Sequence, residues 1–153
     1  MKKFFFIFLL IFVSKNSLSG QDIKPLTNYT FNDVVESQEV NYLIIEGCVS
    51  LYSAITELTK KRYPDLAKQF FEIANTIYPY GIIALSKLKN LSYENAEKTF
   101  FEKVNNLSEL YMMEMNRNGK KTGSYFKYSF LAEDLTYCHE VTKSLQLLVL
   151  ESL

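Results

Sequence analysis

The sequence predicts an all-α protein: an antiparallel helical bundle of about four long helices plus a short one, closed by one disulfide. Only 5 Gly and 3 Pro occur among 153 residues, whereas average usage is about 12% and an all-β fold needs such residues at a turn roughly every 8–12 positions. Apolar residues recur at steps of three and four along most of the chain, which is the spacing of one face of a helix. The two cysteines fall in the first and the last of the long helical patterns.

Residues 1–20 have the three-part layout of a secretory signal peptide. A short start with two lysines precedes residues 4–13, which are all apolar, and small residues follow up to Gly20. The apolar run is too short for a membrane span, which needs about 20 residues. An amphipathic N-terminal helix would need a polar face, which the run lacks. We therefore expect export to the periplasm or the medium, with cleavage after Ser19 or after Gly20.

The end of this segment, Leu18-Ser19-Gly20-Gln21, resembles the processing site of bacterial lipoproteins, which is Leu-Ser-Gly followed by Cys. Gln21 stands where the acylated cysteine would be, so we expect no stable membrane anchor after cleavage. The whole chain has 17 Lys plus Arg and 17 Asp plus Glu, and loss of the leader's lysines makes the remainder mildly acidic. This charge argues against binding to nucleic acid or to an anionic surface.

The remaining chain divides into a lead-in, residues 21–36, and a helical bundle domain, residues 37–153. The lead-in has no clear period and contains Pro25, so we expect an extended segment that packs over one edge of the domain. From Ser37 a single apolar stripe predicts the first long helix, which ends near a basic cluster at residues 60–62. The stripe consists of Val40, Leu43, Ile44, Cys48, Leu51, Ile55 and Leu58.

The second long helix is predicted to begin at Pro64, because proline suits the first helical position. Its inward stripe is Leu66, Phe70, Ile73, Ala74 and Ile77. Pro79 and Gly81 predict a break, followed by a short helix over residues 82–88.

The third long helix is predicted from an N-cap at Ser92 to about Arg117, where Asn118-Gly119 should end it. The last helix follows a polar turn and is capped by Thr122 or Ser124. Its stripe is Leu131, Leu135, Cys138, Val141 or Thr142, Leu145 and Leu148. Glu133 and Asp134 lie just outside that stripe, so we expect them on a solvated edge or in a surface ion pair.

Cys48 and Cys138 are the only cysteines. In an oxidising compartment an even number of cysteines indicates a bridge, and both residues lie within apolar stripes. A bridge would tie the first helix to the last through the core. Two buried free thiols are the alternative, and a metal or redox pair is disfavoured because no Cys-x-x-Cys is present.

The sequence predicts no catalytic residues, no metal site and no cofactor. His139 is the only histidine, and on a helix it points about 100° away from its neighbour Cys138. The turn over residues 118–123 lacks the first glycine and the preceding strand of a phosphate-binding loop. Haem ligation by His139 and a methionine is disfavoured because methionines at helical spacing usually fill a core. An enzyme that uses His139 or Glu133 is the least favoured of three function hypotheses.

Eleven tyrosines suggest a candidate interaction surface, because tyrosine is enriched at protein interfaces. The candidates cluster near the two prolines of the second helix and at the start of the last one: Tyr63, Tyr78, Tyr80, Tyr125 and Tyr128. Ordinary half-buried tyrosines at helix ends are the alternative interpretation.

The layout resembles small exported bacterial and phage proteins that have a signal peptide, one helical domain and a cysteine near each end. The resemblance implies a helical fold but does not point to any particular activity. From the residues themselves we expect a non-enzymatic exported binding or interaction protein of the cell envelope, with a protein partner. The alternative is a carrier of a small apolar ligand or cofactor within the bundle.

Overall fold

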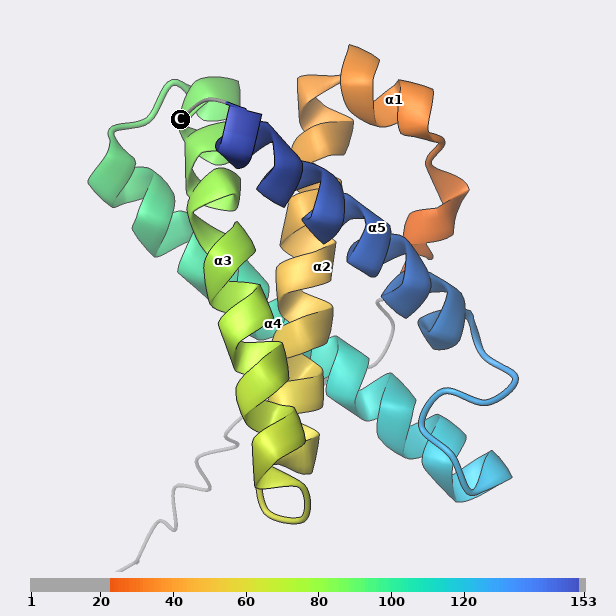
Figure 1. Cartoon of the computed structure of the whole chain (residues 1–153). Coiled ribbons are helices and arrows are strands. Elements are labelled where there is room, and N and C mark those ends of the chain that lie inside the picture. Colours follow the sequence, from red (N-terminus) through yellow and green to blue (C-terminus); the bar gives the residue numbers. More distant parts are fainter. Residues whose placement is uncertain (1–22, 152–153) are drawn as a thin grey trace, which may run out of the picture.

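The computed structural model describes residues 23–151, and within that range the chain is helical and contains no strand (Figure 1). The predicted signal peptide lies outside the described residues. The elements, in chain order, are the 3₁₀ helix η1 (Leu26–Asn28) and the α-helices α1 (Phe31–Glu36), α2 (Gln38–Thr59), α3 (Pro64–Lys89), α4 (Tyr93–Thr122) and α5 (Phe130–Glu151). The predicted all-α bundle of four long helices and a short one is confirmed.

The helices are arranged around α2. Helices α2 and α3 form an antiparallel pair that lies side by side, α4 passes behind both at a slant, and α5 crosses α2 on the opposite face (Figure 1). η1 packs against α5, and α1 packs against α2. The bundle is therefore antiparallel in its α2–α3 pair, while α4 and α5 cross that pair obliquely.

Helix α2 is more deeply buried than a single stripe predicts. Every residue from 44 to 52 is buried, whereas Leu43 of the expected stripe is partly exposed. η1 approaches α2 closely at Gly47, where an added Cβ would lie 2.5 Å from Leu26 Cδ2. A helix that is apolar on all faces belongs in the centre of a fold, and α2 occupies that place.

The lead-in is not extended, contrary to expectation, because it contains η1 and the short helix α1. Thr30 caps α1: its hydroxyl accepts from the Asp33 amide at 3.2 Å, and the Asp33 carboxylate accepts from the Thr30 amide at 2.7 Å. This reciprocal capping box stabilises a helix start. Leu26 is buried, so the segment does pack onto the domain.

The break predicted at Pro79 is wrong, because α3 runs without interruption from Pro64 to Lys89. Proline removes one helical hydrogen bond, but the helix on both sides of it is held by buried Ile77 and Ile82. Gly81 lets the Phe100 ring of α4 pack directly on the α3 backbone. Tertiary packing therefore keeps the helix whole, and the short helix of the fold is α1.

The end of α4 and the start of α5 also differ from expectation. Helix α4 continues past Asn118-Gly119 to Thr122, and Gly123 takes the left-handed conformation with φ of 78°. The buried Asn118 side chain instead donates to the carbonyl oxygens of residues 124, 125 and 127 at 2.9–3.1 Å. These bonds fix a loop after α4, so α5 begins at Phe130 rather than at Thr122 or Ser124.

Candidate functional site

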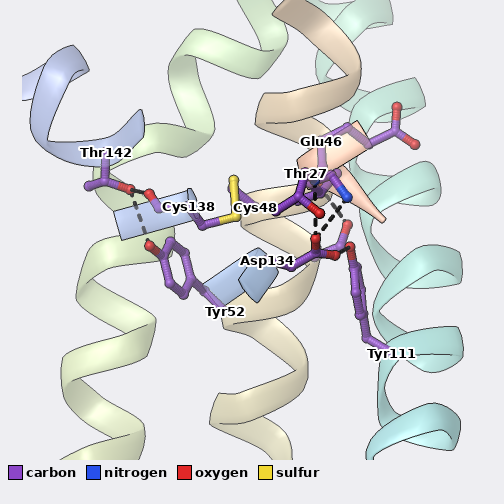
Figure 2. The surroundings of a disulfide bond; sticks show 10 residues. Thr27, Glu46, Cys48, Tyr52, Tyr111, Asp134, Cys138 and Thr142 are labelled. Carbon is purple, nitrogen blue, oxygen red and sulfur yellow. Dashed lines mark hydrogen bonds between the residues drawn. A yellow bond between two sulfur atoms is a disulfide. The ribbon is translucent and has the colours of Figure 1, made fainter. Parts of the chain in front are cut away.

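The predicted disulfide is confirmed and lies at the centre of the fold (Figure 2). Cys48 of α2 and Cys138 of α5 are bonded, with their Cα atoms 5.3 Å apart, and both are fully buried. The bridge fixes the crossing of α5 over α2. Helix α5 therefore has a covalent attachment to the central helix besides its packing contacts.

On the side of the bridge that faces away from η1, hydrogen bonds between polar groups link α2 and α5 (Figure 2). The Thr142 hydroxyl donates to the Cys138 carbonyl oxygen at 2.8 Å. The Tyr52 hydroxyl lies 3.4 Å from Thr142 Oγ1, and because the Thr142 proton is already used, Tyr52 is the donor. Burial raises the pKa of Tyr52. These groups are occupied in structural hydrogen bonds.

On the other side of the bridge, Asp134 joins three segments of the chain (Figure 2). Its Oδ1 accepts from the amides of Leu26 and Thr27, at 2.8 and 3.4 Å, and its Oδ2 accepts from the Tyr111 hydroxyl at 3.5 Å. Burial raises the pKa of Asp134 to about 6, although the backbone and Tyr111 hydrogen bonds act in the opposite direction. The expectation of a solvated edge is wrong for Asp134, which is fully buried, and holds for exposed Glu133.

A cavity of about 370 Å³ lies near this cluster, between the lead-in, α2 and α4. We call it the lead-in cavity. Apolar and polar side chains both line it, and its size lies within the range of small-molecule sites. Its lining consists of Ile23, Lys24, Leu26, Tyr29, Leu43, Glu46, Gly47, Lys103, Asn106, Leu107, Leu110 and Tyr111.

Glu46 is the unusual residue of this lining. It is only 8% exposed, and its Oε2 has no hydrogen-bond partner among residues 23–151. The neighbouring Tyr42 hydroxyl also has no partner within 3.5 Å among these residues, but its pKa is raised by burial and then by a longer hydrogen-bond interaction and a charge interaction with the Glu46 carboxylate. In Figure 2 the Glu46 carboxylate points away from Asp134, towards α4. Glu46 Oε2 and the Tyr42 hydroxyl are both buried from solvent, and the hydroxyl and the carboxylate interact with each other inside the fold.

Two lysines face the same cavity from its exposed side. Lys24 donates to the Tyr29 hydroxyl at 3.2 Å, and the Lys103 ammonium lies 6.0 Å from the centre of the Tyr42 ring. In the part of the chain that the structure describes, neither lysine forms an ion pair with Glu46. The cavity therefore presents one buried carboxylate and two ammonium groups over an apolar floor.

The tyrosines of the predicted interaction surface do not come together. Tyr63 caps the start of α3 and is 51% exposed, while Tyr125 and Tyr128 lie in the loop between α4 and α5. Tyr128 is 84% exposed and has a left-handed backbone, with φ of 60°. Tyr78 packs on Phe100 with ring centres 5.1 Å apart.

Tyr80 belongs to a different hollow, next to Val35 at the end of α1. Val35 is 70% exposed and also borders an apolar groove of about 250 Å³ between α1, α2 and α5. The five tyrosines thus occupy two loops and two sides of α3 rather than one surface.

The sequence did not single out Glu46. The available signal was its position, between Ile45 and Gly47-Cys48, in the most apolar part of α2. Within residues 23–151, no group of three His, Cys, Asp or Glu side chains is placed to hold a metal ion. None of the described helices is long and apolar enough to cross a membrane.

Comparisons of the chain with protein-family models, with curated proteins and with solved structures found no match.

Proposed function

We propose that this protein is an exported, non-enzymatic binding protein whose ligand occupies the lead-in cavity. The observation that carries the proposal is the cavity itself, whose lining combines the exposed Lys24 and Lys103 with Glu46 and apolar side chains. The disulfide supports the export part, since such bonds persist in oxidising compartments, and so does the signal-peptide layout of residues 1–20.

Binding fits the polar groups better than catalysis does. Asp134 and Tyr111 are hydrogen-bonded partners that hold η1, α4 and α5 together. Thr142 and Tyr52 are likewise used in linking α5 to α2. Groups that hold the fold in this way are poorly placed to transfer protons to a substrate, because their own bonds would have to break.

A carrier with its ligand in the middle of the bundle is less well supported than a site at the edge. The centre is filled by the disulfide and by large, fully buried side chains, including Tyr52, Phe100 and Tyr111. The lead-in cavity lies outside this core, where the lead-in covers α2 and α4. A ligand there would be held between a short, locally capped segment and two long helices.

The test uses oxidised protein isolated from its own host under native conditions. Denaturation should release a small molecule, which mass spectrometry identifies. Asn106→Trp places an indole at the cavity wall, and Asn105→Trp places it on the adjacent exposed position of α4, outside the lining. We expect the molecule to be absent from Asn106→Trp and retained by Asn105→Trp. No released molecule from the unaltered protein, or equal amounts from both variants, contradicts the proposal.

A further inference from the structure

The segment that covers the lead-in cavity is attached to the rest of the fold at few points. We call residues 23–36, which comprise η1 and α1, the strap. Leu26 is the only strap residue that is buried, among those whose side chains the structure describes. Near the other end of the strap, Val35 is 70% exposed. Burial of apolar surface therefore holds the strap mainly at Leu26. One wall of the cavity consists of the strap residues Ile23, Lys24, Leu26 and Tyr29.

The hydrogen bonds that join the strap to the rest of the fold converge on Asp134 (Figure 2). The Asp134 Oδ1 accepts from the amides of Leu26 and Thr27, at 2.8 and 3.4 Å. Within residues 23–151, the one other hydrogen bond that leaves the strap is donated by the amide of the adjoining Ser37. None of the ion pairs in this range involves the strap. Asp134 is thus the main polar attachment of the strap.

Asp134 itself is positioned by the disulfide and not by the strap. It lies four residues before Cys138, which is about one helical turn, and Cys138 is bonded to Cys48 of α2. Helices α2, α3 and α4 pack on one another more extensively than the strap packs on any of them. The strap can therefore leave Asp134 without movement of the disulfide or of the long helices.

We propose that the strap opens as a unit over the lead-in cavity while the four long helices stay folded, and that the Asp134 carboxylate makes this opening depend on pH. Both partners of the capping box, Thr30 and Asp33, lie within the strap, so α1 keeps its own start when the strap moves. Segments with few buried apolar contacts open before the core does. Opening removes one wall of the cavity and connects it to solvent. The opening is independent of the proposed function, whereas its use as a ligand entrance rests on that function.

The surroundings of Asp134 set the direction of the pH dependence. The groups that act on it are uncharged amides of η1, the Tyr111 hydroxyl of α4 and the exposed Glu133 of α5. On α2, the Glu46 carboxylate points away from it (Figure 2). Burial raises the pKa of Asp134 to about 6 with the strap closed, and water that reaches the carboxylate of the open form returns the pKa towards 3.8. The closed form holds the proton more tightly, so opening increases as the pH rises through about 6.

Hydrogen exchange of the oxidised protein at low urea concentrations tests the opening. We expect the strap amides to exchange faster than those of the buried residues 44–52 of α2, with little dependence on urea, because their opening exposes little surface. Leu26→Ala should increase strap exchange roughly thirtyfold or more, since it truncates a buried leucine. Thr27→Ala, at the next and exposed position, keeps its amide and should change it little. If strap amides exchange at the same rate and with the same urea dependence as those of α2, the separate opening is overturned.

The same measurement at pH 4 and pH 7 tests the role of Asp134. After correction for the intrinsic exchange rate of each amide, strap opening in the unaltered protein should increase roughly fiftyfold over this range, the factor given by a pKa of about 6 in the closed form and 3.8 in the open form. Glu102→Gln, at an exposed position of α4, should show the same increase, and Asp134→Asn should lack it. An equal increase in Asp134→Asn overturns the role of the carboxylate.

The strap and the proposed function are judged by separate measurements, because exchange is followed without a ligand. If the strap opens as expected but the native protein releases no molecule, the proposed function fails and the strap is supported. If a molecule is released but the strap amides exchange only together with those of α2, the strap is overturned and the proposed function is supported.

Discussion

The buried Asp134 carboxyl should make the stability of this fold depend on pH. Burial raises its pKa in the folded protein from 3.8 to about 6, against the opposing effect of its hydrogen bonds from Leu26, Thr27 and Tyr111. The folded state therefore holds this proton more tightly than the unfolded state does. The contribution of the group to the free energy of unfolding is complete below pH 3.8 and is lost as the pH rises through about 6.

The difference between the two pKa values sets the magnitude. A difference from 3.8 to about 6 corresponds to about 3 kcal/mol in total, and roughly 2–3 kcal/mol of this is lost between pH 4 and pH 7. Asp134→Asn removes the titration while preserving the geometry. The amide oxygen can still accept from Leu26, and the amide nitrogen can donate to the Tyr111 hydroxyl.

The assay is urea unfolding of the oxidised protein at several pH values from 4 to 7, with Glu102→Gln, at an exposed position of α4, as the control. The unaltered protein and the control should lose roughly 2–3 kcal/mol more than Asp134→Asn over that range. The other carboxylates are the same in the unaltered protein and in Asp134→Asn, so their contributions cancel in that comparison. If Asp134→Asn shows the same pH dependence as the unaltered protein, the carboxylate is not held at a raised pKa.

Four further substitutions test the packing and the surface. Cys48→Ala should lower the free energy of unfolding by about 2–5 kcal/mol, because it opens a bridge that spans 90 residues; an unchanged melting temperature of the oxidised protein would show that no bridge forms. Gly81→Ala should cost about 1–3 kcal/mol in urea unfolding, because the new Cβ would lie 2.1 Å from Phe100 Cζ, and a stabilised variant would refute the close contact. Tyr63→Ala and Tyr128→Ser should each leave the free energy of unfolding within about 0.5 kcal/mol, because both side chains are exposed. If either tyrosine contacts a protein partner, co-purification of that partner should be lost in the corresponding variant.

Local signals in the sequence were sufficient for most helix starts. Ser92 caps α4 and Pro64 is the first residue of α3, as predicted. Helix α2 begins next to Ser37, where the apolar stripe was predicted to start, and the Ser37 hydroxyl caps it. The pairing of Cys48 with Cys138 also followed from local information, because each cysteine lies in an apolar stripe of its helix.

Features that depend on contacts between distant segments could not be predicted in the same way. Pro79 does not break α3 because the packing of α3 against the rest of the core outweighs the lost hydrogen bond. Asp134 is buried because backbone amides more than one hundred positions away in the chain reach its carboxylate. Helix α4 continues past Asn118 because the Asn118 side chain donates hydrogen bonds to carbonyl oxygens of the following loop.

The lead-in cavity depends on the same kind of contact. It exists because Leu26 packs on Gly47 and brings the lead-in over α2 and α4. A periodicity analysis of either helix alone contains no information on that contact. The unusual placement of Glu46 in the most apolar part of α2 was visible, but its meaning required the cavity.

The most direct test of an exported, disulfide-closed binding protein is its native, non-reduced mass after isolation from the envelope or the medium of its own host. We expect a chain that begins after Ser19 or Gly20, two hydrogen atoms lighter than the reduced form, with a small molecule held non-covalently. A full-length, reduced chain without a bound molecule would contradict the account.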